Sequence, residues 1–341
     1  MTERLDQFMA RANQAYYATH DPFADFTTAP EISQVFGEII GLWCVVSWRL
    51  LGEPSPVRLV EAGPGRGTLM ADALRAITQV AADFRRALSL DLIETSPRLR
   101  ARQAETLPDA IWHTSLATIP AGPMILIANE FLDALPIRQF VRRGEGWTER
   151  HIGAEGFFEC PSEAGLAATA WDEQTTADGR NGGPVVNEGE IVEVGEAAGS
   201  FVAALAARFA SHPGAALFLD YGPAESAPGD SLQAIAGGRS ADPLTAPGKA
   251  DLTAHVDFAA LAKIARGRGG AVFGPVPQGL FLTRLGLYQR TNRLARNLSP
   301  QRALALLEAA QRLAEPHRMG RLFKAMALCH PSCPTLPGFE T

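Results

Sequence analysis

The chain has 341 residues, of which 46% are hydrophobic and 20% are charged, enough to bury a large core in two domain-sized units or in one domain with added segments. A formal net charge of −6, with no block of Lys and Arg, argues against a nucleic-acid partner. The most apolar stretch, residues 41–52, is short and contains Arg49, and the first residues lack the apolar core of a signal peptide. We therefore expect a cytoplasmic protein without a membrane span.

The first 55 residues predict helices. Apolar residues at helical spacing over residues 5–16 predict a short amphipathic helix. Residues 28–52 predict one long, mostly buried helix, because Pro30 suits a first turn and Gly52 suits an end.

From Pro56 onward, short apolar runs alternate with amphipathic ones. Helices are predicted at residues 68–84 and 96–107, and strands are predicted at residues 57–63, 88–95, 110–115 and 123–131. These strands lack in/out alternation, which is typical of a parallel sheet covered on both faces. The fold class we expect is therefore a doubly wound, Rossmann-like α/β sheet.

An insertion interrupts this rhythm near residue 137. Residues 137–160 alternate around glycine-rich turns, as antiparallel hairpins do, and residues 172–190 indicate a polar loop. Later segments predict strands at 214–222 and 271–277, a Gly/Pro-rich loop at 222–250, and helices at 197–212, 255–269, 287–297 and 299–314. We divide the chain into an N-terminal helical segment that covers the cofactor site, residues 1–54, and a Rossmann-like domain, residues 55–341. That domain carries an insertion at about 138–190 and added C-terminal helices at about 285–328.

The turn after the first predicted strand has the pattern of a nucleotide site. Gly63, Gly65 and Gly67 form G-x-G-x-G, whereas a dinucleotide fingerprint needs its last glycine at position 68, which is Thr68. Glu61 would lie close to a pyrophosphate that it repels, but S-adenosylmethionine carries a sulfonium and an ammonium and no phosphate. This pattern favours S-adenosylmethionine over NAD, and a tight turn without any ligand is the remaining alternative.

A second acid and the cysteines complete the ligand predictions. Glu94 closes the next strand, where an acid can accept the ribose hydroxyls of NAD or of S-adenosylmethionine. The four cysteines form no paired C-x-x-C units, and Cys329, His330 and Cys333 alone are a weak metal pattern. We expect no metal in the mechanism.

Several runs of the sequence together resemble one family. They are "DFTTAPEISQVFGEIIGLW", "VEAGPGRGTLMADALR", "ETSPRLR", "ANEFLDALPIRQF", "LDYG", "LQAI", "PGKADLTAHVDFAAL" and "MGRLFKAMA". In this order, over about residues 16–328, they resemble the MidA family of class I S-adenosylmethionine-dependent methyltransferases. The resemblance implies a seven-stranded class I sheet with extra N-terminal and inserted segments. The family's mitochondrial member is a protein arginine methyltransferase that assists assembly of respiratory complex I, so the implied partner is a protein methylated on arginine.

The resemblance also implies roles for individual residues. Carried over by motif, the methionine part is held by Glu61, Gly63, Gly65 and Gly67, the ribose by Glu94, and the adenine lies near Ser115 and Leu116. Asn129 and Glu130 face the reacting methyl group, and Asp25 and Phe26 belong to a segment that covers the cofactor.

Three residues are candidates for the chemistry. A guanidinium stays protonated in proteins, and paired carboxylates can localise its charge and leave one nitrogen richer in electrons. Glu130 and Asp133, three residues apart after a predicted strand, are the candidate pair, although Asp133 could equally cap a helix that begins near Ala134. His255 is the candidate proton acceptor, with packing at a helix start, capped by Thr253 or Asp257, as the alternative.

Other functions stay open at this point. The first alternative is an assembly factor or interaction module that binds S-adenosylmethionine with little turnover, and the second is an NAD-dependent oxidoreductase, which Thr68 and Glu61 disfavour. A homodimer is also left open.

Overall fold

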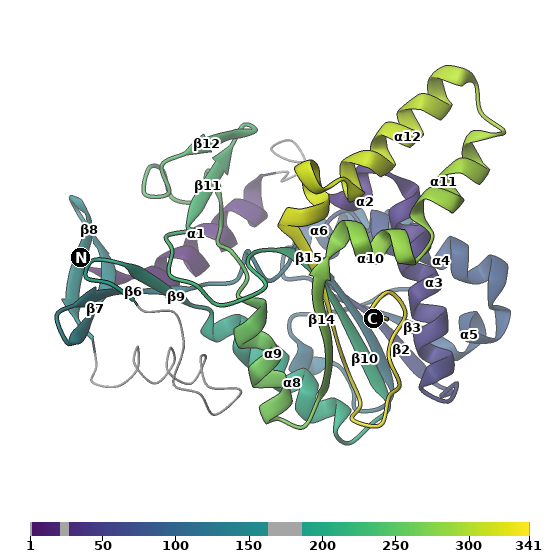
Figure 1. Cartoon of the computed structure of the whole chain (residues 1–341), viewed down its shortest axis with the longest axis horizontal. Helices are drawn as coiled ribbons and strands as arrows, with labels where there is room; N and C mark the ends of the chain where they lie inside the picture. The colour runs from purple at the N-terminus through teal and green to yellow at the C-terminus, as the bar shows by residue number, and fades with distance from the viewer. Residues whose placement is uncertain (1, 21–26, 163–185, 341) are drawn as a thin grey trace. The chain divides into compact units, whose positions relative to one another are not determined.

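The computed structural model describes residues 2–20, 27–162 and 186–340 (Figure 1). The chain forms two compact units. Unit 1 comprises Met1–Phe26, Leu132–Ala203 and Gly222–Ile264, and unit 2 comprises Thr27–Phe131, Ala204–Tyr221 and Ala265–Thr341. The division into residues 1–54 and 55–341 stays a prediction.

Unit 2 is built on a seven-stranded sheet of order β14-β15-β10-β5-β2-β3-β4 (Figure 1). The strands are β2 (Val57–Ala62), β3 (Leu88–Ile93), β4 (Ile111–His113), β5 (Met124–Asn129), β10 (Gly214–Tyr221), β14 (Ala271–Pro277) and β15 (Phe323–Cys329). Strands β10, β5, β2, β3 and β4 are parallel, whereas β15 runs antiparallel to both β10 and β14. The expected seven-stranded class I sheet is confirmed, but residues 323–329 had not been predicted as a strand.

Both faces of this sheet are buried. On one face, Leu59 of β2 and Ile125 of β5 belong to a core cluster that also holds Trp43 and Phe84. The residue between Leu59 and Glu61, Val60, points to the opposite face and is equally buried. Burial on both faces explains why the strands are continuous apolar runs rather than alternating ones.

In unit 2, two segments that the sequence predicts as single helices each form two helices. The predicted helix at 28–52 is two helices, α2 (Ala29–Ile32) and α3 (Gln34–Leu50), because Ser33 is extended and its Oγ accepts a hydrogen bond from Val35 N at 3.2 Å. The predicted helix at 68–84 is likewise α4 (Thr68–Val80) and α5 (Ala82–Ala87). The other α-helices that lie wholly in unit 2 are α6 (Pro97–Thr106), α10 (Gln278–Arg284), α11 (Leu287–Ala295) and α12 (Pro300–Ala314).

Unit 1 contains two antiparallel sheets. The larger has the order β1-β7-β6-β9 with β8 on β7, and the smaller has the order β12-β11-β13. The strands are β1 (Glu3–Arg4), β6 (Arg138–Arg143), β7 (Gly146–Gly153), β8 (Gly156–Pro161), β9 (Ile191–Val194), β11 (Gln233–Ala236), β12 (Arg239–Ala241) and β13 (Asp251–Thr253). The helix α1 (Leu5–Thr19) and the hairpins predicted at 137–160 are confirmed.

The segment predicted as a loop at 222–250 contains the β11–β12 hairpin. Gly237 and Gly238 join the two strands and have φ values of +58° and +71°, as a type I′ turn requires. Two of the points at which the chain passes from one unit to the other lie within α8 (Glu196–Phe209) and α9 (Phe258–Gly267). Helix α9 begins three residues later than predicted.

Candidate functional site

The glycine turn, residues 63–67, joins β2 to α4 in unit 2. Gly63, Gly65 and Gly67 all have positive φ, at +65°, +55° and +79°, a conformation that other residues adopt only with strain. A Cβ on Gly63 would lie 2.9 Å from Cδ2 of Phe131, and one on Gly67 would lie 3.0 Å from Cδ1 of Leu107. Both backbone conformation and neighbouring side chains therefore require glycine here.

We expect Gly63→Ala to destabilise the protein more than Gly52→Ala. Gly52 also has positive φ, at +86°, but a Cβ there meets nothing within 4 Å. Gly52→Ala should therefore cost only the backbone strain, about 1 to 2 kcal/mol, and Gly63→Ala a further ~1 kcal/mol or more from overpacking. Urea unfolding measures both, and equal losses would show that Phe131 moves aside freely.

Glu61 places a buried carboxylate directly before this turn. Its side chain lies on β2, the residue is 3% exposed, and no described residue donates a hydrogen bond to its Oε2 atom. Burial raises the pKa of Glu61 from 4.5 to about 8. A buried carboxyl without a partner is costly unless a ligand supplies one, and an ammonium group would do so.

The side-chain amide of Gln103 connects Glu94 to the glycine turn. The Nε2 atom of Gln103 donates to Gly65 O at 2.8 Å and to Glu94 Oε2 at 3.3 Å, while Trp112 Nε1 donates to Gln103 Oε1 at 2.8 Å. Ser96 N donates to Glu94 Oε1 at 2.8 Å, and burial raises the pKa of Glu94. Sequence analysis missed Gln103, although its position four residues after the buried Leu99 places it on the buried face of α6.

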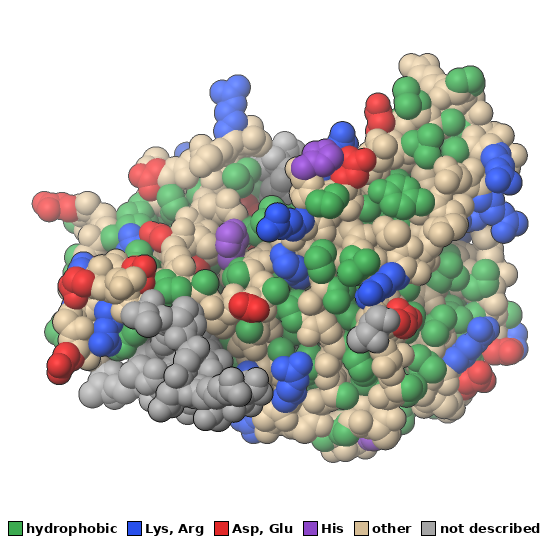
Figure 2. All heavy atoms as spheres, viewed as in Figure 1, with side chains coloured by type: hydrophobic (Ala, Val, Ile, Leu, Met, Phe, Trp, Pro, Cys, Tyr) green, Lys and Arg blue, Asp and Glu red, His purple; other side chains and the backbone are tan. Residues whose placement is uncertain are grey.

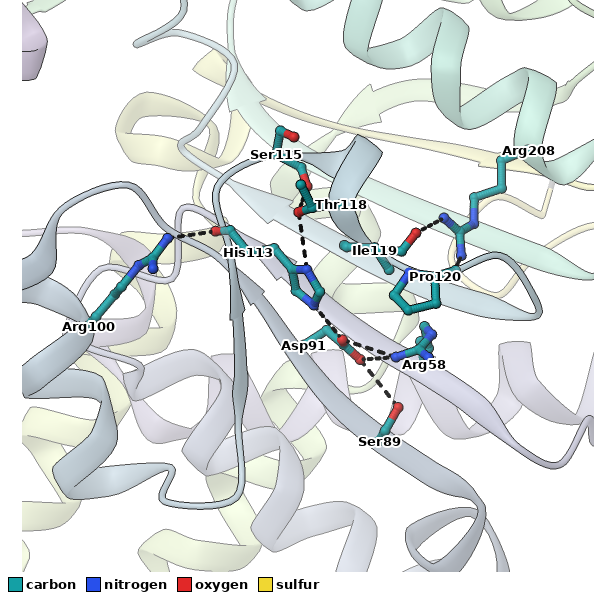
Figure 3. A network of polar contacts seen from close by, with 10 residues as sticks. All are labelled: Arg58, Ser89, Asp91, Arg100, His113, Ser115, Thr118, Ile119, Pro120 and Arg208. Atoms are coloured by element: carbon teal, nitrogen blue, oxygen red, sulfur yellow. Dashed lines mark hydrogen bonds and ion pairs between the residues drawn. The ribbon is translucent and has the colours of Figure 1, made fainter.

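Ser115 and Leu116 follow β4, next to the end of β3. Glu94 N donates to His113 O at 3.0 Å, which joins the two strand ends. Ser115 then accepts hydrogen bonds at its carbonyl oxygen from Thr118 N at 3.2 Å and from Thr118 Oγ1 at 2.9 Å (Figure 3). Leu116 begins the short 3-10 helix Leu116–Thr118 inside this turn.

Asn129 ends β5 at the same edge of the sheet, and Glu130 follows it. Glu130 has φ of +49°, which is strained for a residue with a side chain and is typical of functional sites. Its Oε1 atom accepts hydrogen bonds from Asn129 Nδ2 at 3.2 Å and from Ala29 N, at the start of α2, at 3.0 Å. The carboxylate is therefore fixed in place, and it also holds the first turn of α2.

Asp133 belongs to unit 1, and its predicted alternative role is wrong. No helix begins near Ala134, because Leu135 N donates to Leu132 O at 3.1 Å and the chain turns there. Asp133 therefore caps no helix at this place. It is 7% exposed, and its carbonyl oxygen accepts a hydrogen bond from Ala254 N at 3.0 Å.

His255 also belongs to unit 1 and is exposed. Its backbone N donates to Ser231 Oγ at 2.8 Å, and Asp257, not Thr253, caps α9 by accepting from Ala260 N at 2.9 Å. The catalytic roles of Asp133 and His255 stay predictions, and Asp25 and Phe26 lie outside the described residues. Across the described ranges, no group of three or more His, Cys, Asp or Glu could hold a metal ion.

Known proteins resemble this chain over most of its length. Residues 39–276 match a family described as S-adenosyl-L-methionine-dependent methyltransferases. The chain is 34% identical to the mitochondrial protein arginine methyltransferase NDUFAF7 of Danio rerio, over 95% of this chain and 82% of that protein. It is 33% identical to the Drosophila melanogaster homolog, over 96% and 80%. A COG1565 superfamily member from Burkholderia thailandensis, solved with S-adenosyl-homocysteine, is similar with a TM-score of 0.80 and 26% identity, over 99% of this chain and 90% of that one.

The expected cytoplasmic location is wrong, because the relatives from Danio rerio and Drosophila melanogaster are mitochondrial proteins. Composition and charge separate water-soluble proteins from membrane proteins, but they do not distinguish one aqueous compartment of the cell from another. In the part of the chain that the structure describes, no helix has the length and apolarity to cross a bilayer. On the face in Figure 2, acidic and basic side chains are interspersed, and the expectation of no nucleic-acid partner stays a prediction.

Proposed function

We propose that this chain, which belongs to the family of S-adenosyl-L-methionine-dependent methyltransferases, transfers the methyl group to an arginine side chain of a protein partner. The names of the relatives from Danio rerio and Drosophila melanogaster support arginine as the acceptor. The observation that carries the proposal is the buried carboxylate of Glu61, since no described residue donates to its Oε2 atom. A respiratory complex I subunit or assembly client is the partner that the MidA resemblance implies.

The residues at the carboxyl edge of the unit 2 sheet fit this cofactor. Glu61 supplies a negative charge for the ammonium group, and the glycine turn lets the backbone approach the methionine part. Glu94 is held by Ser96 and Gln103 in a fixed orientation toward the ribose that we assign to it. When bound, the cofactor supplies a methyl group on a positively charged sulfur.

We assign Glu130 to the guanidinium group of the acceptor arginine. The group is protonated and a poor nucleophile, so it must be aligned and its charge drawn to one side. The Glu130 carboxylate, held by Asn129 and Ala29, can attract the guanidinium charge to one side and leave the opposite nitrogen facing the methyl donor. The roles predicted for His255, as acceptor of the proton that the substrate loses, and for Asp133, as a second carboxylate, stay predictions from the sequence.

Thermal unfolding with added ligands tests the cofactor assignment. S-adenosylmethionine or S-adenosyl-homocysteine at ~100 times its dissociation constant should add about 2.7 kcal/mol of stability, and NAD should add none. Mass spectrometry of cells lacking this protein should then show the loss of one methyl-arginine mark. Stabilisation by NAD alone would overturn the proposal in favour of an oxidoreductase.

A further inference from the structure

The short helix α2 contacts both Glu130 and the first residue after the glycine turn. It contains only residues Ala29–Ile32, and it is not continued by α3, because Ser33 between the two helices is extended, with φ of −156° and ψ of 128°. A single helical turn fixes several backbone dihedral angles for very few hydrogen bonds, so it is unstable by itself. The position of α2 therefore depends on its contacts with other segments.

One of these contacts joins α2 to Glu130. Ala29 is fully buried, and its backbone N donates to Glu130 Oε1 at 3.0 Å. The first amides of a helix have no acceptor within that helix, so the Glu130 carboxylate satisfies a donor that α2 itself cannot. A movement of α2 would take this hydrogen bond away from the carboxylate that we assign to the acceptor arginine.

A second contact joins α2 to the start of α4. The Oγ1 atom of Thr68 donates to Glu31 Oε1 at 2.5 Å, and both residues are half-buried. A hydrogen bond from a hydroxyl to a carboxylate is charge-assisted and stronger than one between neutral groups. Because Thr68 directly follows Gly67, this bond holds α2 against the end of the glycine turn.

Thr68 is also the position at which this chain departs from the dinucleotide fingerprint. The third glycine of G-x-G-x-x-G would have no hydroxyl there, and Glu31 Oε1 would lose this donor. The backbone of Thr68 is helical, so its conformation does not require glycine. What a threonine adds at position 68 is therefore the hydrogen bond to α2.

We propose that Thr68 and Glu31 are positioning residues for Glu130. The Thr68 hydroxyl holds Glu31, Glu31 belongs to the single turn of α2, and Ala29 N of that turn holds the Glu130 carboxylate in place. The inference rests on the proposed function, in which Glu130 contacts the guanidinium group. In this role, neither Thr68 nor Glu31 needs to touch the substrate or the cofactor.

Hydrogen exchange of the Ala29 amide in the ligand-free protein, followed by NMR, tests the contact without any assay of activity. Thr68→Val keeps the shape of the side chain and removes the hydroxyl, so α2 should open more often and Ala29 N should exchange about tenfold faster. Thr68→Ser keeps the hydroxyl and should exchange as wild type does. Thr78→Val is the matched control on α4, because Thr78 Oγ1 donates to Leu74 O of its own helix, at 2.7 Å, and the exchange of Ala29 should not change.

The kinetics of methyl transfer test the link to Glu130. The acceptor is the arginine peptide whose methyl mark is lost from cells lacking this protein. Thr68→Val should lower kcat about tenfold, because a small displacement of a reacting group slows the reaction, and should leave the dissociation constant of S-adenosyl-homocysteine within about twofold. In the Glu130→Gln background, the same change should cause less than about a twofold further loss, because the carboxylate that it positions is already absent.

Glu31→Ala removes the other partner of the same hydrogen bond. It should reproduce the faster exchange of Ala29 N and the lower kcat, and combined with Thr68→Val it should add little to either effect. If Thr68→Val fails to fold, Glu31→Ala carries the same test.

Three results overturn the inference alone. Unchanged exchange of Ala29 N in both Thr68→Val and Glu31→Ala shows that their contact does not hold α2. Weaker binding of S-adenosyl-homocysteine with unchanged kcat shows that Thr68 acts on the cofactor, and a full tenfold further loss in the Glu130→Gln background shows that it does not act through Glu130. If instead no methyl-arginine mark is lost from cells lacking this protein, the proposed function fails, and with it the role of Glu130 that the inference needs.

Discussion

Glu130→Gln should lower kcat for methyl transfer by about three orders of magnitude and leave the dissociation constant of S-adenosyl-homocysteine within about twofold. The substitution keeps the shape of the side chain and removes the negative charge that we assign to the acceptor guanidinium. It does not touch Glu61, Glu94 or the glycine turn. Transfer to a peptide of the partner, followed by mass spectrometry, measures kcat, and calorimetry measures cofactor affinity.

Glu130 also accepts a hydrogen bond from Ala29 N, so a structural effect needs a control. Glu53→Gln is a matched control for Glu130→Gln, because Glu53 is an exposed glutamate whose φ of +55° is also positive. It should behave as wild type in both assays. If the Glu130→Gln protein still matures its client without methylating it, the alternative of a binding module with little turnover is favoured instead.

Glu61→Gln should weaken S-adenosyl-homocysteine binding on the order of 100-fold, the usual effect of removing a charged hydrogen bond. The ammonium group would then lie beside a buried amide instead of a carboxylate. Calorimetry near pH 8 measures the change, and an unaltered affinity would contradict the assignment of Glu61 to the ammonium group.

The same substitution should stabilise the ligand-free protein at high pH. The pKa of Glu61 is about 8 in the folded protein against 4.5 as the ordinary value, so between these values the folded state binds more protons than the unfolded state. Stability therefore falls as the pH rises through this window, and the loss is complete above about pH 8. Glutamine does not titrate, so the Tm of Glu61→Gln should exceed that of wild type increasingly from pH 5 to about pH 8.5.

Glu105→Gln is the control for this pH profile. Glu105 is an exposed acid on α6 that pairs with Arg102, and its contribution to stability should be small. Its Tm should follow that of wild type across the whole range. A wild-type Tm that does not fall relative to Glu61→Gln would show that the Glu61 carboxyl is already paired in solution.

The carboxyl edge of the unit 2 sheet could be predicted from the sequence because that edge follows directly from strand periodicity, whereas the roles assigned to its residues stay predictions. Strands buried on both faces are continuous apolar runs, so Glu61, Glu94 and Glu130 stand out as acids at or near strand ends. The break at Ser33 was missed because the apolar pattern continues across it, and only the serine side chain marks the new start. β15 was missed because a short segment that is apolar except for Lys324 fits a strand or a buried helix equally.

Contacts between residues far apart in the sequence could not be predicted from the spacing of apolar residues. Gln103 is important because its side chain donates hydrogen bonds to Gly65 and Glu94, and its neighbours in the sequence do not indicate these partners. The contacts of Asp91 with neighbouring strands (Figure 3) depend on the lateral order of β2, β3 and β4, which only the assembled sheet specifies. The Gly237–Gly238 hairpin, in contrast, carries a recognisable local signal that sequence analysis did not use.

The side-chain amide of Gln103 connects two parts of the proposed cofactor site, the glycine turn and Glu94. One planar group, oriented by Trp112, donates to the backbone of the glycine turn and to the acid assigned to the ribose. We expect a movement of Gly65 or of Glu94 to rotate the Gln103 amide and to weaken its hydrogen bond to the other residue. In the proposed site, the rotamer of Gln103 therefore connects the residues that we assign to the amino-acid end and to the sugar end of the cofactor, so we expect a ligand fragment bound at one end to affect binding at the other.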